Sequence, residues 1–138
     1  MSAYRQQETK FKDEACLKQA LIDNGYAENM IEVHEQPQTL IDYHGHARPQ
    51  KANVIIRKLH VGAAANDIGF IKNDKTGCYE AIISDYDRHR HNAAWMTKVG
   101  KSYAEHRLIK QSRTMGLLYL GKQVDAKGKP QLKFAVQG

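Results

Sequence analysis

The sequence has 138 residues, of which 41% are apolar and 26% are charged, and this composition is that of a globular protein rather than a disordered chain. The length predicts a single domain spanning residues 1–138. No apolar run approaches the roughly 20 residues of a membrane helix, and the opening MSAYRQQETK is too polar for a signal peptide. We therefore expect neither a transmembrane nor a secreted protein. Cys16 and Cys78 lack CxxC spacing, which argues against a disulfide framework and a zinc knuckle and predicts a reducing, cytoplasmic compartment.

The net charge of +6 is distributed unevenly along the chain. Residues 1–87 carry −3, residues 88–113 carry +6, and residues 114–138 carry +3. The basic side chains of the middle segment are Arg88, Arg90, Lys98, Lys101, Arg107, Lys110 and Arg113. Such a cluster attracts polyanions and releases their counterions, so it predicts nucleic acid or a phosphate-bearing nucleotide as a partner. A solvated helix surface is the alternative, because at about 100° per residue these positions spread around the helix.

The first half of the chain alternates short apolar runs with turn residues. Residues 4–12 predict a strand with Phe11 facing the core, and Asp13 is the expected N-cap of a helix that stops at Gly25. The expected inner face of this helix is Leu17, Ala20 and Leu21. MIEVHE and QTLIDYHG predict two strands separated at Pro37, and KANVIIRKLH predicts a central strand.

The second half predicts two hairpins around one long helix. NDIGFIK and CYEAIIS are joined by residues 73–77, which have hairpin chemistry. Residues 92–115 predict the helix, with Gly116 as its stop signal, and LLYLGKQV and QLKFAVQ predict a terminal hairpin. The predicted fold is therefore α+β: a mainly antiparallel sheet of about six to eight strands with two helices packed on one face.

The order of several segments resembles a known family. The segments are ETKFKDEACLKQALIDNGY, ANVIIRK, NDIGF, YEAIISD, SYAEHRLIKQSRTMGL and GKPQLKFAV. Together, from Lys10 to Val136, they are similar to the domain of unknown function 1257 family of plastids, cyanobacteria, other bacteria and phages, which includes the hypothetical chloroplast reading frame 35 product. The resemblance implies a compact α+β fold, no established enzymatic activity, and a cytoplasm, plastid stroma or infected-cell cytoplasm as the compartment. Because some bacterial relatives lie beside genes of AAA-type ATPases, it also implies a partner or adaptor role.

This chain departs from the family pattern at two places. Family members often carry an Asp-Trp-Trp-like segment after the YE strand, whereas this chain has SDYDRHRH at residues 84–91. LHVGAAAND resembles a lengthened connection between strands. Its VGAAANDIG part lacks the Gly-Lys-Ser/Thr ending of a Walker loop and leads into a strand, so it is no dinucleotide fingerprint either. We expect no cofactor.

Two His-x-His pairs offer the sharpest chemical site in the sequence. These pairs are His44 with His46 and His89 with His91, and candidate third metal ligands are His34, Asp42, Asp85 and Asp87. On a strand this spacing puts both imidazoles on one face, where they could bind a divalent metal. The alternative is structural, because His44 and His46 occupy an expected turn and the arginines beside His89 and His91 repel a cation.

Residues 85–91 also combine carboxylates, guanidinium groups and imidazoles, the parts of a phosphodiesterase or nuclease, without a nucleophile motif. Three hypotheses follow. The leading one is a non-enzymatic protein that binds nucleic acid or a nucleotide through the seven basic residues above. The second is a homo-oligomer or adaptor in which the acidic first 87 residues of one copy meet the basic last 51 of another. The third is a metal-dependent hydrolase.

Overall fold

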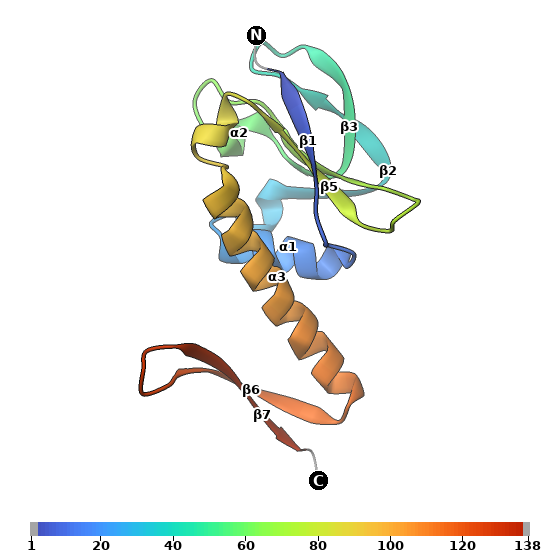
Figure 1. The fold of residues 1–138 in the computed structure, drawn as a ribbon. Helices are drawn as coiled ribbons and strands as arrows, with labels where there is room; N and C mark the ends of the chain where they lie inside the picture. The colour runs from blue at the N-terminus through green and yellow to red at the C-terminus, as the bar shows by residue number, and fades with distance from the viewer. Residues whose placement is uncertain (1–2, 137–138) are drawn as a thin grey trace.

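The computed structural model describes residues 3–136 and has an α+β fold (Figure 1). Five antiparallel strands form one sheet in the order β1-β5-β4-β3-β2, and β6 and β7 form a second sheet. The strands are β1 (Tyr4–Glu8), β2 (Ile31–Ile41), β3 (Ala47–Ile56), β4 (Ile68–Lys72), β5 (Tyr79–Ser84), β6 (Leu117–Val124) and β7 (Pro130–Val136). The helices are α1 (Glu14–Asp23), α2 (Lys58–Val61) and α3 (Ala93–Thr114), with 3-10 turns at Glu28–Met30 and Asp87–His89.

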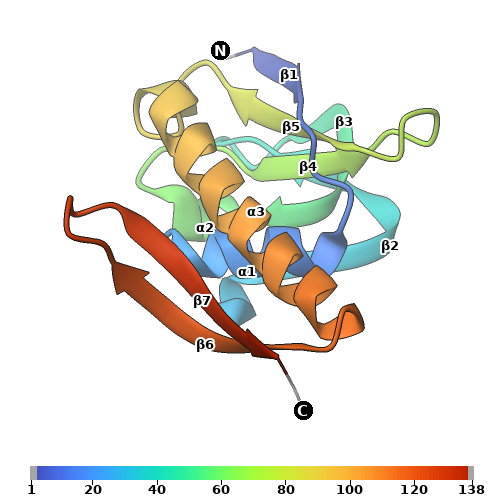
Figure 2. The same cartoon turned by 60° about the horizontal axis from the view of Figure 1, so that its bottom comes forward.

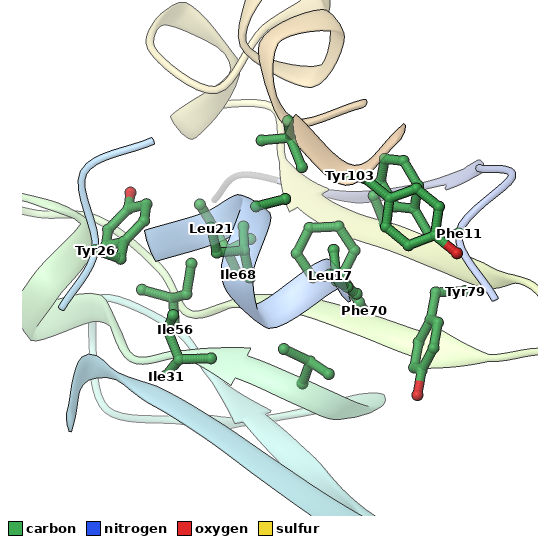
Figure 3. Packing of buried hydrophobic residues seen from close by; sticks show 14 of the residues in the cluster. Phe11, Leu17, Leu21, Tyr26, Ile31, Ile56, Ile68, Phe70, Tyr79 and Tyr103 are labelled. Carbon is green, nitrogen blue, oxygen red and sulfur yellow. The ribbon is translucent and has the colours of Figure 1, made fainter. Parts of the chain in front are cut away.

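The main core lies between one face of the five-stranded sheet and the helices α1 and α3 (Figure 3). Leu17 and Leu21 of α1 are fully buried there, as the sequence predicts, against Phe70 of β4. From the other side, α3 contributes Val99 and Tyr103. The expected packing of two helices against one face is therefore confirmed, whereas the strands form sheets of five and two instead of one sheet of six to eight. The four-residue helix α2 was not predicted from the sequence.

The long β2–β3 hairpin folds over the opposite face of the sheet, where it forms a second, smaller core of Leu40, Ala52, Ile55 and Ile82. Gly69 of β4 is the residue that permits this close approach. A Cβ atom at position 69 would lie 2.5 Å from the Cβ of Ala52 and 3.0 Å from the Leu40 side chain. Only glycine fits between the layers at this point.

The prediction of two strands separated at Pro37 is wrong. Pro37 lies inside the single strand β2, and the chain turns later, between Asp42 and His46. Among the described residues β2 is an edge strand that pairs only with β3, and its register shifts between Val33 and Gln38. Proline is tolerated at such a place because an irregular edge strand needs no ladder hydrogen bond from its nitrogen.

The local signals at the ends of the helices are confirmed. The Asp13 carboxylate accepts a hydrogen bond from the Cys16 N–H at 3.0 Å and so caps α1. Asn92 caps α3 in the same way through the Trp95 N–H, and Gly116 follows α3 with a φ of +74°. From this point the terminal hairpin extends along α3, away from the five-stranded sheet (Figures 1 and 2).

Candidate anion-binding surface

The seven basic residues proposed from the sequence do not form one continuous surface. Five of them lie on α3 and two lie in the segment before it, which includes the 3-10 turn Asp87–His89. Because α3 packs between the main core and the terminal hairpin, its basic side chains project in different directions. They fall into three groups, with different partners.

The first group, Arg107 and Lys110, is bound to the N-cap of α1. Asp13 Oδ2 lies 3.2 Å from Arg107 Nη1 and 2.5 Å from Lys110 Nζ. Burial raises the pKa of Asp13, but the hydrogen bonds from Lys110 and from the Cys16 N–H outweigh burial and lower this pKa to about 2. This carboxylate thus holds α1 and α3 together. Arg107 and Lys110 contribute to the fold before any ligand binds.

The second group, Arg88 and Arg90, precedes α3. Arg88 Nε lies 4.0 Å from Asp85 Oδ1, and Asp85 also pairs with Arg5 across the β1–β5 edge of the sheet. Arg90 is exposed, and its guanidinium lies beside Gly62 in the loop that follows α2. The two arginines therefore lie at the α2 end of the molecule, apart from the C-terminal half of α3.

The third group comprises Lys98, Lys101 and Arg113, which are exposed and form no ion pair within residues 3–136. Lys101 lines a hollow of about 130 Å³ together with Lys129 of the terminal hairpin. Glu105 lines the same hollow, but its carboxylate already pairs with Lys122 Nζ at 2.5 Å. The hollow therefore presents unpaired ammonium groups from two separate elements.

Lys101 and Lys129 line this hollow, and we define the helix–hairpin surface as these two lysines together with the exposed lysine nearest in sequence to each, Lys98 and Lys127. Lys98 is one turn from Lys101 on α3, and Lys127 is two residues from Lys129 in the hairpin turn. The sequence showed that residues 114–138 carry +3, but it did not show that the hairpin folds back along α3. This return packs β6 against α3 and brings Lys129 to the same hollow as Lys101.

A comparison with protein-family models matches residues 8–132 to the family described as protein of unknown function (DUF1257). The chain belongs to the DUF1257 family. No curated protein and no solved structure shows a significant match to it. The narrower resemblance to the chloroplast reading frame 35 product stays a prediction. The matched range of this DUF1257 protein includes α3, Lys127 and Lys129, and so the whole helix–hairpin surface.

The histidine pairs of the DUF1257 protein are not arranged as metal ligands. His44 and His46 are exposed in the turn after β2, where their backbone N–H groups donate to Asp42 Oδ1. His89 is exposed, whereas His91 is buried with its Nε2 2.5 Å from the Tyr26 hydroxyl. Within residues 3–136 no three His, Cys, Asp or Glu side chains are grouped so that they could hold a metal ion.

Asp87, one of the carboxylates in the predicted phosphodiesterase or nuclease segment of this DUF1257 protein, has structural partners. Asp87 is 2% exposed, and its Oδ2 accepts hydrogen bonds from the Asn66 backbone N–H, the Asn66 side chain and the Ser84 hydroxyl. Three donors on one buried oxygen compensate its charge and fix the loop before β4 against the end of β5.

In the part of the chain that the structure describes, no helix is long and apolar enough to cross a membrane.

Proposed function

We propose that this protein binds a polyanion, nucleic acid, through the helix–hairpin surface, with Arg113 farther along α3 as an additional contact. The observation that carries the proposal is the hollow shared by Lys101 and Lys129. Both ammonium groups are exposed and lack an acidic partner among the described residues, so a phosphate can approach them without displacing an ion pair. Two lysine-bearing elements along one hollow can follow a phosphate backbone.

The ion pairs favour the lysines of the helix–hairpin surface over Arg107 and Lys110 as the phosphate-binding residues. A phosphate at Arg107 or Lys110 would compete with Asp13, which is itself the cap of α1. Lys98, Lys101, Lys127 and Lys129 form no ion pair among the described residues, since the nearby carboxylates of Glu105 and Asp125 are bound by Lys122 Nζ and by backbone N–H groups of the hairpin turn. The aromatic rings of the core are not offered for stacking, since Tyr103 is only 8% exposed. Backbone contacts rather than base contacts are therefore expected to dominate.

Co-purification tests this proposal directly. The protein is purified at low salt, the ratio of absorbance at 260 and 280 nm is recorded, and the material removed by a high-salt wash is analysed by mass spectrometry. Nucleic acid released by salt supports the proposal. A protein that is clean at low salt and fails to shift a labelled RNA or DNA oligonucleotide contradicts it.

A second candidate function is self-assembly through the terminal hairpin, and one observation favours it. Leu118, Leu120, Val124 and Val136 of this hairpin are between 48% and 81% exposed. A two-stranded sheet is marginally stable alone and gains from a covering partner. The head-to-tail version has less support, because Asp42, Asp67 and Asp87 of the acidic first segment are buried. Gel filtration at low and high salt separates the candidates, since an apolar hairpin contact persists in salt.

A further inference from the structure

A groove lies on another face of α3, away from the helix–hairpin surface. It has a volume of about 800 Å³ and is bounded on one side by residues 7–12, the end of β1 and the segment after it. The other side is one face of α3 from Ala93 to Gln111. Figure 2 shows the segment after β1 running beside α3. The two walls belong to segments more than 80 residues apart in the sequence.

The floor of this groove is apolar. Met96, Gly100 and Ala104 follow each other at intervals of four residues along α3, and Leu108 continues the row. Leu108 is 48% exposed and Ala104 is exposed as well, although both are apolar. Phe11 and Tyr103 close the floor with rings 4.7 Å apart, 6% and 8% exposed. Met96 is partly buried against the main core and Gly100 lies beside the Phe11 ring, so Ala104 and Leu108 are the exposed part of this apolar track.

The end of an edge strand, Gln7 and Glu8 of β1, lines one part of the groove. β1 pairs with β5 alone among the described residues, so its second edge is unpaired, and four of its five residues are exposed. An unpaired edge offers backbone N–H and C=O groups to an incoming strand. An extended peptide can use these groups while its alternate side chains enter the apolar track.

The charge at one end of the groove selects the chemistry of this peptide. Lys10 and Lys12 are exposed without an acidic partner among the described residues, and Arg107 shares the single carboxylate of Asp13 with Lys110. Positive charge is thus in excess at this end, and Glu8 is the acidic residue along the lining. A partner with carboxylates at its end would be attracted there.

We propose that this groove binds an extended peptide of a partner protein, in which apolar side chains alternate with polar ones and acidic residues lie at one end of the apolar stretch. The face of α3 from Ala93 to Gln111 is about 27 Å long at 1.5 Å per residue, which accommodates about eight residues of extended peptide. Nucleic acid suits this groove poorly, because its floor is apolar and its two aromatic rings are buried. The inference is independent of the polyanion proposal, since the two surfaces share none of their defining residues.

A display experiment followed by matched variants tests the proposal. Random twelve-residue peptides displayed on phage are selected on the full chain, and enriched peptides are synthesised with a fluorescent label for anisotropy measurements. We expect acidic sequences with alternating apolar residues. Ala104→Gln places a longer side chain in the track and should weaken binding at least tenfold. Ala94→Gln, at an exposed position of α3 outside the groove, should leave it unchanged.

Two further comparisons separate the contribution of Lys12 to peptide binding from that of the β1 edge. Lys12→Gln should weaken binding about two- to fivefold, as for an exposed ion pair, while Lys75→Gln in the β4–β5 turn should not. A peptide with N-methylated backbone nitrogens should lose binding, because it cannot donate hydrogen bonds to β1. The proposal is overturned if no peptide is enriched, if the enriched peptides are basic, or if Ala104→Gln binds them as tightly as the unmodified chain. Decanoate serves as a second probe. If it binds and no peptide is enriched, the groove is assigned to an aliphatic anion and the peptide proposal is overturned as well.

Discussion

Replacing Lys101 and Lys129 together by glutamine should change how strongly nucleic acid binding depends on salt. If each of the four lysines of the helix–hairpin surface neutralises one phosphate of a single strand, the logarithm of the association constant falls with that of the salt concentration with a slope of about −2.8. Raising salt from 50 to 200 mM then weakens binding about 50-fold. With two lysines removed, the slope falls to about −1.4 and the same salt change weakens binding only about sevenfold.

Fluorescence anisotropy with a labelled single-stranded RNA at several salt concentrations measures both slopes. Lys72→Gln with Lys75→Gln is the matched control, because it removes the same charge from two exposed lysines near the β4–β5 turn. The control should weaken binding slightly through the net charge while keeping the slope near −2.8. Equal slopes for the Lys101/Lys129 variant and the unmodified chain would refute our placement of the phosphate contacts at the shared hollow.

Three further predictions concern stability. Gly69→Ala should destabilise the fold by about 1–3 kcal/mol in urea unfolding, because the new methyl group overlaps Ala52. Asp13→Ala should cost about 1–2 kcal/mol, since it removes the cap of α1 and leaves Lys110 without its partner. In the unmodified chain the Asp13 contribution is present above pH 4 and is lost as pH falls toward 2, because its folded pKa is lowered from 3.8 to about 2. Burial lowers the pKa of the His91 imidazole below its usual 6.5. Protonation of His91 therefore favours the unfolded state, and the free energy of unfolding decreases progressively as pH falls below 6.5.

Each of these stability predictions has a control that can contradict it. Gly100→Ala adds a methyl group 3.9 Å from the Phe11 ring, without a steric clash, so an equal loss of stability at positions 69 and 100 would contradict the packing argument. Asp74→Ala changes an exposed carboxylate and should leave the acid-side pH dependence unchanged. His44→Gln, at an exposed turn position, should keep the pH dependence below 6.5; if it abolishes that dependence, His91 is not its source.

Features that depend on a few neighbouring residues could be predicted from the sequence. The N-cap at Asp13, the stop at Gly116 and the turn at residues 73–77 are each fixed by local hydrogen bonding or by a positive φ. Pro37 was misinterpreted because its effect depends on the position of β2 at the edge of the sheet. That position is decided by long-range pairing, which no window around Pro37 contains.

The candidate site likewise combines features that the local sequence predicts with features that depend on long-range packing. Counting charges located the basic segment, but it could not show that Lys110 forms an ion pair with Asp13, a residue 97 positions away. Nor could it show that Lys129 and Lys101 line one hollow, because that arrangement depends on the angle at which the hairpin leaves α3. The groove beside β1 was missed for a related reason: Met96, Gly100 and Ala104 indicate only a core-facing row until the packing of α3 shows which part of the row stays uncovered.

The attachment of the terminal hairpin has a consequence for local unfolding. Among the described residues β6 and β7 pair only with each other, and α3 is the element against which β6 packs. The hairpin can therefore detach and rebind without opening the main core, so its amide hydrogens should exchange with solvent orders of magnitude faster than those of β4. Lys127 and Lys129 belong to this loosely held unit, and a ligand that bridges them to Lys101 would slow that exchange by holding the hairpin against the helix.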